Sequence, residues 1–239
     1  MPPSARLMKE ILLVGSGVVG ATYAYRLSMS GMARVTIVAR SNYDAINFCR
    51  SVADAADQPY SYVFVTTKAI PDVTATPDIL RLLVSPPYAD LYPQPTYLLL
   101  QNGLNVEKDL YEVIRKLGKG SPNIISTTLW FQANLLGPNV VEHGSVLPAH
   151  LGEEEVLQDL QKILSSGGGT ATVVPEIQRA KFQKNSLNVV VSSLATLTGY
   201  LPPAVWRSSP AGSGVPPYEP FVFDTTRHLI EEYTLQGYM

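Results

Sequence analysis

A glycine pattern near the start of the chain, G-x-G-x-x-G, constrains the fold more than any other feature of the sequence. It follows an apolar run at residues 10–14, which predicts a buried strand, and it opens a stretch of small residues at 18–29, which favours a closely packed helix. The first glycine allows a tight turn out of the strand, and the third allows the helix to pack closely on it. We therefore predict a strand–turn–helix unit whose turn comprises Gly15, Ser16, Gly17, Val18, Val19 and Gly20.

The same turn predicts a binding site for a dinucleotide. The second glycine, Gly17, has no Cβ, so a pyrophosphate can approach the backbone closely. The helix that starts here presents N–H groups without intrahelical partners to those phosphates. We expect the six turn residues to bind the cofactor. The alternative is a glycine-rich turn in an α/β domain that binds no ligand.

The end of the second predicted strand, residues 35–39, indicates which dinucleotide is preferred. Chains that prefer NAD usually carry an Asp or Glu about 20 residues after the last glycine, where it binds the ribose 2′-hydroxyl. Arg40, Ser41 and Asn42 occupy this place. Because no carboxylate repels a 2′-phosphate and a guanidinium can bind it, the sequence favours NADP over NAD. The alternative is that Arg40 is a solvated surface residue.

Short apolar runs alternate with longer mixed segments, which predicts an α/β fold with a Rossmann-type parallel sheet. A turn at Gly137-Pro138 indicates an antiparallel hairpin at the edge of that sheet, formed by residues 124–132 and 140–146. Further strands are predicted at 62–67, 96–100 and 172–174, helices at 72–84, 106–117, 153–165, 176–197 and 221–236, and a flexible glycine turn at 167–169.

The sequence also predicts two domains. A boundary near Pro175 separates a cofactor-binding domain, 1–175, from a smaller all-helical substrate domain, 176–239. The second domain begins with a long helical pattern and then becomes rich in Pro, Ser and Gly at 202–220, which is unusual for a helical domain.

Two polar positions follow predicted strands. Lys68 comes directly after the strand at 62–67, and Asn102 follows the strand at 96–100. Both are expected at the carboxyl ends of parallel strands, where open α/β sheets bind ligands. The alternatives are a solvated charge at Lys68 and an ordinary turn at Asn102.

Lys184, Asn188 and Ser192 are spaced four residues apart in the predicted helix 176–197, so they share one face. Apolar residues flank them, which indicates a mostly buried helix, where a lysine needs a partner or a chemical role. A cationic lysine can protonate a ketone oxygen while hydride arrives, and the amide and hydroxyl groups can bind the same substrate. The alternative is that Lys184 extends to solvent beside Lys181.

Composition and charge argue against several classes of protein. The net charge of −2 gives no electrostatic case for binding nucleic acid or an anionic membrane. The single cysteine, Cys49, excludes an internal disulfide framework and a multi-cysteine zinc site, and we expect no bound metal. No His lies near it in sequence, so it is a poor candidate nucleophile. We find no secretory signal and no run of about 18 apolar residues, and we expect a cytoplasmic protein.

In this order and spacing, the motifs resemble those of the ketopantoate reductase (2-dehydropantoate 2-reductase) family, its fungal-type members in particular. The resemblance extends from residue 9 to about residue 199. The matching segments are G-S-G-V-V-G at 15–20, A-R-S-N at 39–42, T-T-K-A at 66–69, L-Q-N-G at 100–103, E-H-G at 142–144 and F-Q-K-N-S-L-N at 182–188.

The resemblance implies NADPH-dependent reduction of the 2-keto acid ketopantoate to pantoate, on the route to pantothenate. It implies that Lys184 is the general acid, that Asn188 contacts the substrate, that Asn102 lies near the nicotinamide and the substrate, and that Lys68 lies near the cofactor. Ser192 stands where many members have a second Asn that binds substrate.

Lys181 is a rival for the lysine role, with Asn185 four residues further on. Phe182 at the family's aromatic position favours Lys184 instead.

The family's second domain continues beyond the length of this chain and carries a Ser and a Glu that hold the substrate, and neither has a match here. We therefore expect a shortened substrate domain. A homodimer is a separate expectation.

Two other functions stay open. One is a non-catalytic NADP-binding protein or a defective paralogue that acts through partner contacts, which would bind NADPH without turning over a 2-keto acid. The other is a 2-hydroxy acid dehydrogenase of another family, which needs a catalytic His. Against it, none of the three histidines has a clear acid partner in sequence: His143, His150 and His228.

Overall fold

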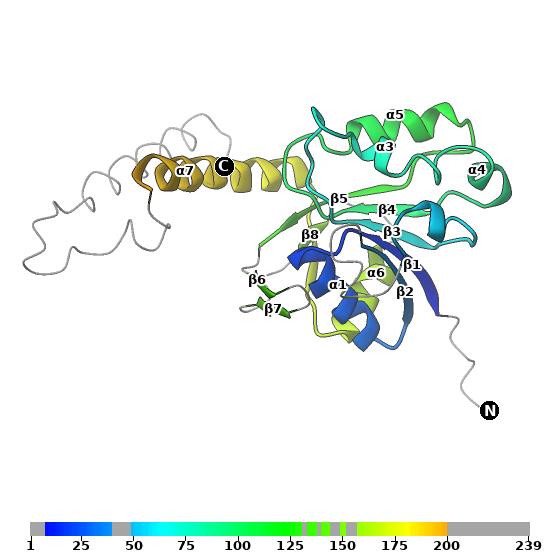
Figure 1. Ribbon diagram of the computed structural model, residues 1–239, viewed down its shortest axis with the longest axis horizontal. Helices are drawn as coiled ribbons and strands as arrows, with labels where there is room; N and C mark the ends of the chain where they lie inside the picture. The colour runs from blue at the N-terminus through cyan, green and yellow to red at the C-terminus, as the bar shows by residue number, and fades with distance from the viewer. Residues whose placement is uncertain are drawn as a thin grey trace, which may run out of the picture. The chain divides into compact units, whose positions relative to one another are not determined.

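The computed structural model describes residues 8–39, 49–130, 133–137, 140–143, 149–151 and 157–199 (Figure 1). It divides into two compact units, Met1–Ile177 and Gln178–Met239, whereas the sequence places the boundary near Pro175. Arg40 and the predicted helix at 221–236 lie outside the described residues.

The first unit is built on a seven-stranded sheet with the order β2-β1-β3-β4-β5-β8-β9. The first five strands in this order run parallel, β8 is antiparallel to β5, and β9 is parallel to β8. This confirms the predicted Rossmann-type parallel sheet. The strands are β1 (Lys9–Val14), β2 (Ala33–Val38), β3 (Tyr62–Val65), β4 (Thr96–Leu99), β5 (Ile124–Leu129), β8 (Ala149–Leu151) and β9 (Ala171–Val173).

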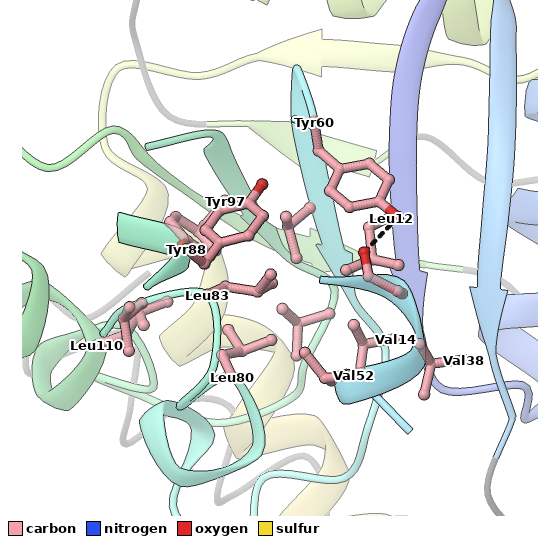
Figure 2. Packing of buried hydrophobic residues seen from close by; sticks show 14 of the residues in the cluster. Leu12, Val14, Val38, Val52, Tyr60, Leu80, Leu83, Tyr88, Tyr97 and Leu110 are labelled. Atoms are coloured by element: carbon pink, nitrogen blue, oxygen red, sulfur yellow. Dashed lines mark hydrogen bonds between the residues drawn. The ribbon is translucent and has the colours of Figure 1, made fainter. Parts of the chain in front are cut away.

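Helices cover both faces of this sheet (Figure 1). Successive side chains of a strand point to opposite faces, so Ile11 and Leu13 pack with α1 (Val18–Met29) and α6 (Leu157–Ser166). Leu12 and Val14 belong to the second core cluster, on the other face (Figure 2). That face is covered by η1 (Ala53–Ala55), α3 (Thr76–Ile79), α4 (Tyr88–Leu91) and α5 (Lys108–Lys116).

An antiparallel hairpin is present, but the predicted pairing is wrong, because residues 124–129 form β5 of the main sheet and do not pair with residues 140–143. The strands of the hairpin are β6 (Ala133–Gly137) and β7 (Val140–His143), which form a separate two-stranded antiparallel sheet. The reason is that β5 already pairs with β4 on one side and with β8 on the other, which leaves it no edge for a hairpin.

The predicted helix at 72–84 is wrong in length, because only α3 and the turns after it are formed. Pro77 lies in the first turn of α3, where its missing N–H costs nothing. In a helix that began at residue 72, the same proline would remove an interior hydrogen bond and clash with the preceding turn.

Of the second unit, the structure describes one helix, α7 (Ile177–Thr198), which agrees closely with the predicted 176–197. The expectation that this helix is mostly buried is wrong. Lys181 and Val190 are its buried residues, whereas Leu187 and Val189 are exposed. Among the helices that the structure describes, none combines the length and apolar character needed to cross a membrane.

Candidate functional site

The glycine turn is enclosed by backbone at two positions and open at a third. A Cβ added to Gly20 would lie 2.0 Å from the carbonyl oxygen of Gly15, a distance that no carbon atom tolerates. Gly15 has a φ of +108°, and a Cβ there would meet the hydroxyl oxygen of Thr66 at 2.7 Å. Gly17 has nothing within 4 Å of the same position. The turn is therefore open at Gly17, the glycine that the sequence assigns to the approach of the pyrophosphate.

The start of α1 suits an anion. Gly17 is the residue before the first turn of the helix, and no side chain caps it. The first turn contains no acidic residue, so nothing there repels a phosphate. The first N–H groups of a helix lack intrahelical acceptors and point along the axis toward such a ligand. The turn therefore fits the diphosphate of a dinucleotide.

Neighbouring strands hold the turn in place. The Gly15 N–H donates to the carbonyl oxygen of Val38 at the end of β2, at 3.0 Å. Directly after β3, the Thr66 hydroxyl donates to the carbonyl oxygens of Gly15 (2.8 Å) and Val14 (3.2 Å). Since β2 and β3 flank β1, the turn lies where the order of the sheet reverses, which is the ligand-binding point of such folds.

Thr66 is a residue to which sequence reasoning gave no role, although its segment was part of the motif at 66–69. The available signal was a threonine directly after an apolar strand. That signal is weak, because its partner, the carbonyl of Gly15, is 51 residues away in sequence.

Two of the predicted residues follow neighbouring parallel strands. Lys68 lies three residues after β3 and Asn102 three residues after β4, and both side chains are exposed. β3 and β4 pair in register up to Val65 and Leu99, so these loops leave the sheet side by side. A buried glutamine, Gln101, donates from its side-chain nitrogen to the carbonyl oxygen of Thr67 at 3.0 Å. It thus joins the two loops directly, and sequence reasoning gave it no role.

The chain returns to the end of β2 after residues 40–48. Cys49 forms a parallel bridge with Val38, and its carbonyl oxygen accepts a hydrogen bond from Ala39. Burial raises the pKa of the Cys49 thiol, and the carboxylates of Asp54 and Asp57 raise it further. A thiol shifted in this direction carries little thiolate at neutral pH, which agrees with Cys49 being a poor candidate nucleophile.

The other predicted residues lie on α7, in the second unit. Lys184 and Asn188 are half-buried, and Ser192 is exposed. Burial lowers the pKa of Lys184 to about 8, because the desolvated ammonium is disfavoured. A lysine with this pKa is still protonated at neutral pH but gives up its proton more readily than a solvated one, as a general acid requires. Lys181, the rival, is only 4% exposed.

Comparison with known proteins identifies the family. The family model described as "Ketopantoate reductase PanE/ApbA" matches residues 11–155. An uncharacterized protein of Saccharomyces cerevisiae is 24% identical over an alignment of 230 positions, and the alignment covers 80% of this chain. The chain spans 65% of the length of that curated relative.

Solved structures share the fold at low sequence identity. A PanE/ApbA family ketopantoate reductase from Ralstonia eutropha superposes with a TM-score of 0.69 at 19% identity, covering 95% of this chain and 75% of the other. A D-mandelate dehydrogenase in complex with NADH gives 0.68 at 16% identity, with 95% and 74% covered. The fold is thus shared by a protein named for ketopantoate and a protein named for D-mandelate. On the strength of the family match over more than half of its residues, the chain belongs to the ketopantoate reductase family.

Proposed function

We propose that this protein is an NADPH-dependent reductase that converts ketopantoate to pantoate in pantothenate biosynthesis. The observation that carries the proposal is the glycine turn, in which Gly17 is open at the N-terminus of α1. The chain that contains this turn belongs to the ketopantoate reductase family. In this assignment residues 1–175 form the cofactor-binding domain and residues 176–239 form the substrate domain.

The proposal gives each group a separate task. The turn residues 15–20 hold the diphosphate, Arg40 binds the ribose 2′-phosphate, and Lys68 lies near the cofactor. Bound NADPH would supply the hydride. Lys184 donates the proton to the ketone oxygen, while Asn188, Ser192 and Asn102 bind the polar groups of the keto acid.

Preference for NADPH over NADH rests on Arg40 and on the absence of a carboxylate from the sequence at 40–42. Calorimetric titration of the full chain with each nucleotide tests it. We expect tighter binding of NADPH, and an Arg40→Ala variant that loses affinity for NADPH but not for NADH. Equal affinity of the unaltered protein for the two nucleotides would contradict the preference.

Turnover is tested by the loss of NADPH absorbance in the presence of ketopantoate and of a panel of bulkier 2-keto acids. The second candidate function, a non-catalytic NADP-binding protein that acts through partner contacts, is favoured by the exposed apolar side chains of α7, Leu187, Val189 and Leu197. Tight NADPH binding without turnover of any keto acid would favour that candidate. The cytoplasmic location and the homodimer stay predictions, which a fluorescent fusion and light scattering test.

A further inference from the structure

Two candidate ligand-binding positions are each one residue away from a buried hydrogen bond. Lys68 follows Thr67, and Asn102 follows Gln101. Thr67 and Gln101 belong to the loops that leave β3 and β4 at the same edge of the sheet. A hydrogen bond between Thr67 and Gln101 therefore also restrains the backbone that carries the side chains of Lys68 and Asn102.

The side chain of Gln101 forms these hydrogen bonds. Its side chain is 5% exposed, and its amide nitrogen donates to both the carbonyl oxygen (3.0 Å) and the hydroxyl oxygen (3.2 Å) of Thr67. Its amide oxygen accepts from the hydroxyl of Thr76, the first residue of α3, at 3.3 Å. One buried amide thus joins the loop after β3, the loop after β4 and the start of a helix, and both of its N–H donors are used.

The joined segments continue to the glycine turn. Thr66, the neighbour of Thr67, is the residue whose hydroxyl bonds to the carbonyl of Gly15. A line of side-chain hydrogen bonds therefore connects the carboxyl ends of β4, β3 and β1, the three strand ends that surround the proposed cofactor site. Because these ends are fixed before the ligand binds, binding causes a smaller loss of conformational entropy.

We propose that Gln101 is a positioning residue for the cofactor, which holds the Thr67–Lys68 backbone and Asn102 in their binding geometry. The inference rests on the proposed function, since it assigns a role within that site. Gln101 acts through its neighbours and does not itself contact the cofactor.

The chain offers a matched control at the other end of the same strand. Gln94 precedes β4, and its amide nitrogen donates to the carbonyl oxygen of Leu83 at 2.9 Å. Its amide oxygen accepts from the hydroxyl of Tyr97 at 2.9 Å. The two glutamines thus make the same kinds of bond at opposite ends of β4, and only Gln101 lies at the end where the site is expected.

The experiment compares Gln101→Glu with Gln94→Glu in the full chain. Each change keeps the size of the side chain but removes its N–H donors, so both should lower the midpoint of urea unfolding. Calorimetric titration with NADPH then separates the effects. We expect the dissociation constant to rise about tenfold for Gln101→Glu and less than twofold for Gln94→Glu, with one binding site per folded chain in both.

A milder variant, Thr67→Val, removes one of the two acceptors and should weaken NADPH binding about threefold; it serves if Gln101→Glu does not fold. Restoring the hydroxyl in Thr67→Ser should recover the affinity. Unchanged affinity in folded Gln101→Glu, or an equal loss in both glutamine variants, would overturn the positioning role while leaving the proposed function intact. Failure of the unaltered protein to bind NADPH would overturn both.

Discussion

At the scale of single residues, the three glycines of the turn differ in what fixes them. Gly20 and Gly15 are required by neighbouring atoms, whether or not a ligand is bound. Gly17 faces open space, so nothing described within the chain requires it to be glycine. The sequence motif could not reveal this difference, because it assigns a task to each glycine from the pattern alone.

This difference gives a testable contrast. We expect Gly20→Ala to lower the free energy of unfolding by about 1–3 kcal/mol or more, because α1 must move away from β1 to admit the new carbon. Gly17→Ala should fold with a loss of about 1 kcal/mol or less and yet lose NADPH affinity, because its Cβ occupies the approach of the diphosphate. Urea denaturation and calorimetry measure the two effects, and normal NADPH binding by folded Gly17→Ala would contradict the assignment.

Lys184 gives a prediction for the dependence of activity on pH. Since the protonated lysine is the active form and its pKa is lowered to about 8, kcat/KM should be level below that pH and fall about tenfold per pH unit above it. Lys184→Met should reduce kcat/KM by about 10²–10⁴-fold with little change in NADPH affinity.

The matched control for this lysine is the exposed Lys162 on α6, whose change to Met should leave kcat/KM unaltered. A large loss in Lys181→Met, together with normal turnover in Lys184→Met, would transfer the role to Lys181. A pH profile that stays level to pH 10 would argue against a lysine acid.

At the scale of elements, the triple glycine at 167–169 packs closely against α1, whereas the sequence indicated only a flexible turn. A Cβ at Gly167 would lie 1.9 Å from the carbonyl oxygen of Arg26, near the end of α1. The Arg26 guanidinium in turn donates to the carbonyl oxygen of Gly167 at 3.2 Å. The turn after α6 therefore fixes the far end of the helix whose beginning forms the glycine turn.

We expect Gly167→Ala to lower the free energy of unfolding by about 1–3 kcal/mol, because either the turn or α1 must shift. Gly169→Ala is the control, since its Cβ would meet its nearest neighbour, the carbonyl oxygen of Leu164, at 3.1 Å and its φ is ordinary. Chemical denaturation compares the two variants. Equal stabilities would show that the contact between α1 and this turn is dispensable.

At the scale of the whole molecule, the cofactor should act as a stabilising ligand of the folded chain. A nucleotide that binds only the folded state adds about 2.7 kcal/mol at a concentration 100 times its dissociation constant. We therefore expect NADPH to raise Tm progressively with concentration, and NADH to need a higher concentration for the same shift. Thermal denaturation with each nucleotide checks this, and Tm values that do not respond to either would contradict cofactor binding.

The sequence by itself determined the local parts of this protein. The apolar runs identified β1, β3 and β4, and α1 begins and ends where the small-residue stretch predicted. The glycine spacing identified the turn, because backbone sterics and side-chain periodicity act over a few neighbouring residues. The roles of Lys184, Asn188 and Arg40 stay predictions.

Only the tertiary structure decided which distant groups meet. The hydrogen bond of Thr66 to Gly15 joins residues 51 positions apart, and that of Gln101 to Thr67 joins residues 34 positions apart. The hydrogen bond of Arg26 to Gly167 joins residues 141 positions apart. The pairing of β8 with β5, which displaces the hairpin from the sheet, is of the same kind. Such contacts depend on how the layers pack, and a buried donor finds its acceptor only after the chain has folded, so no local pattern can specify them.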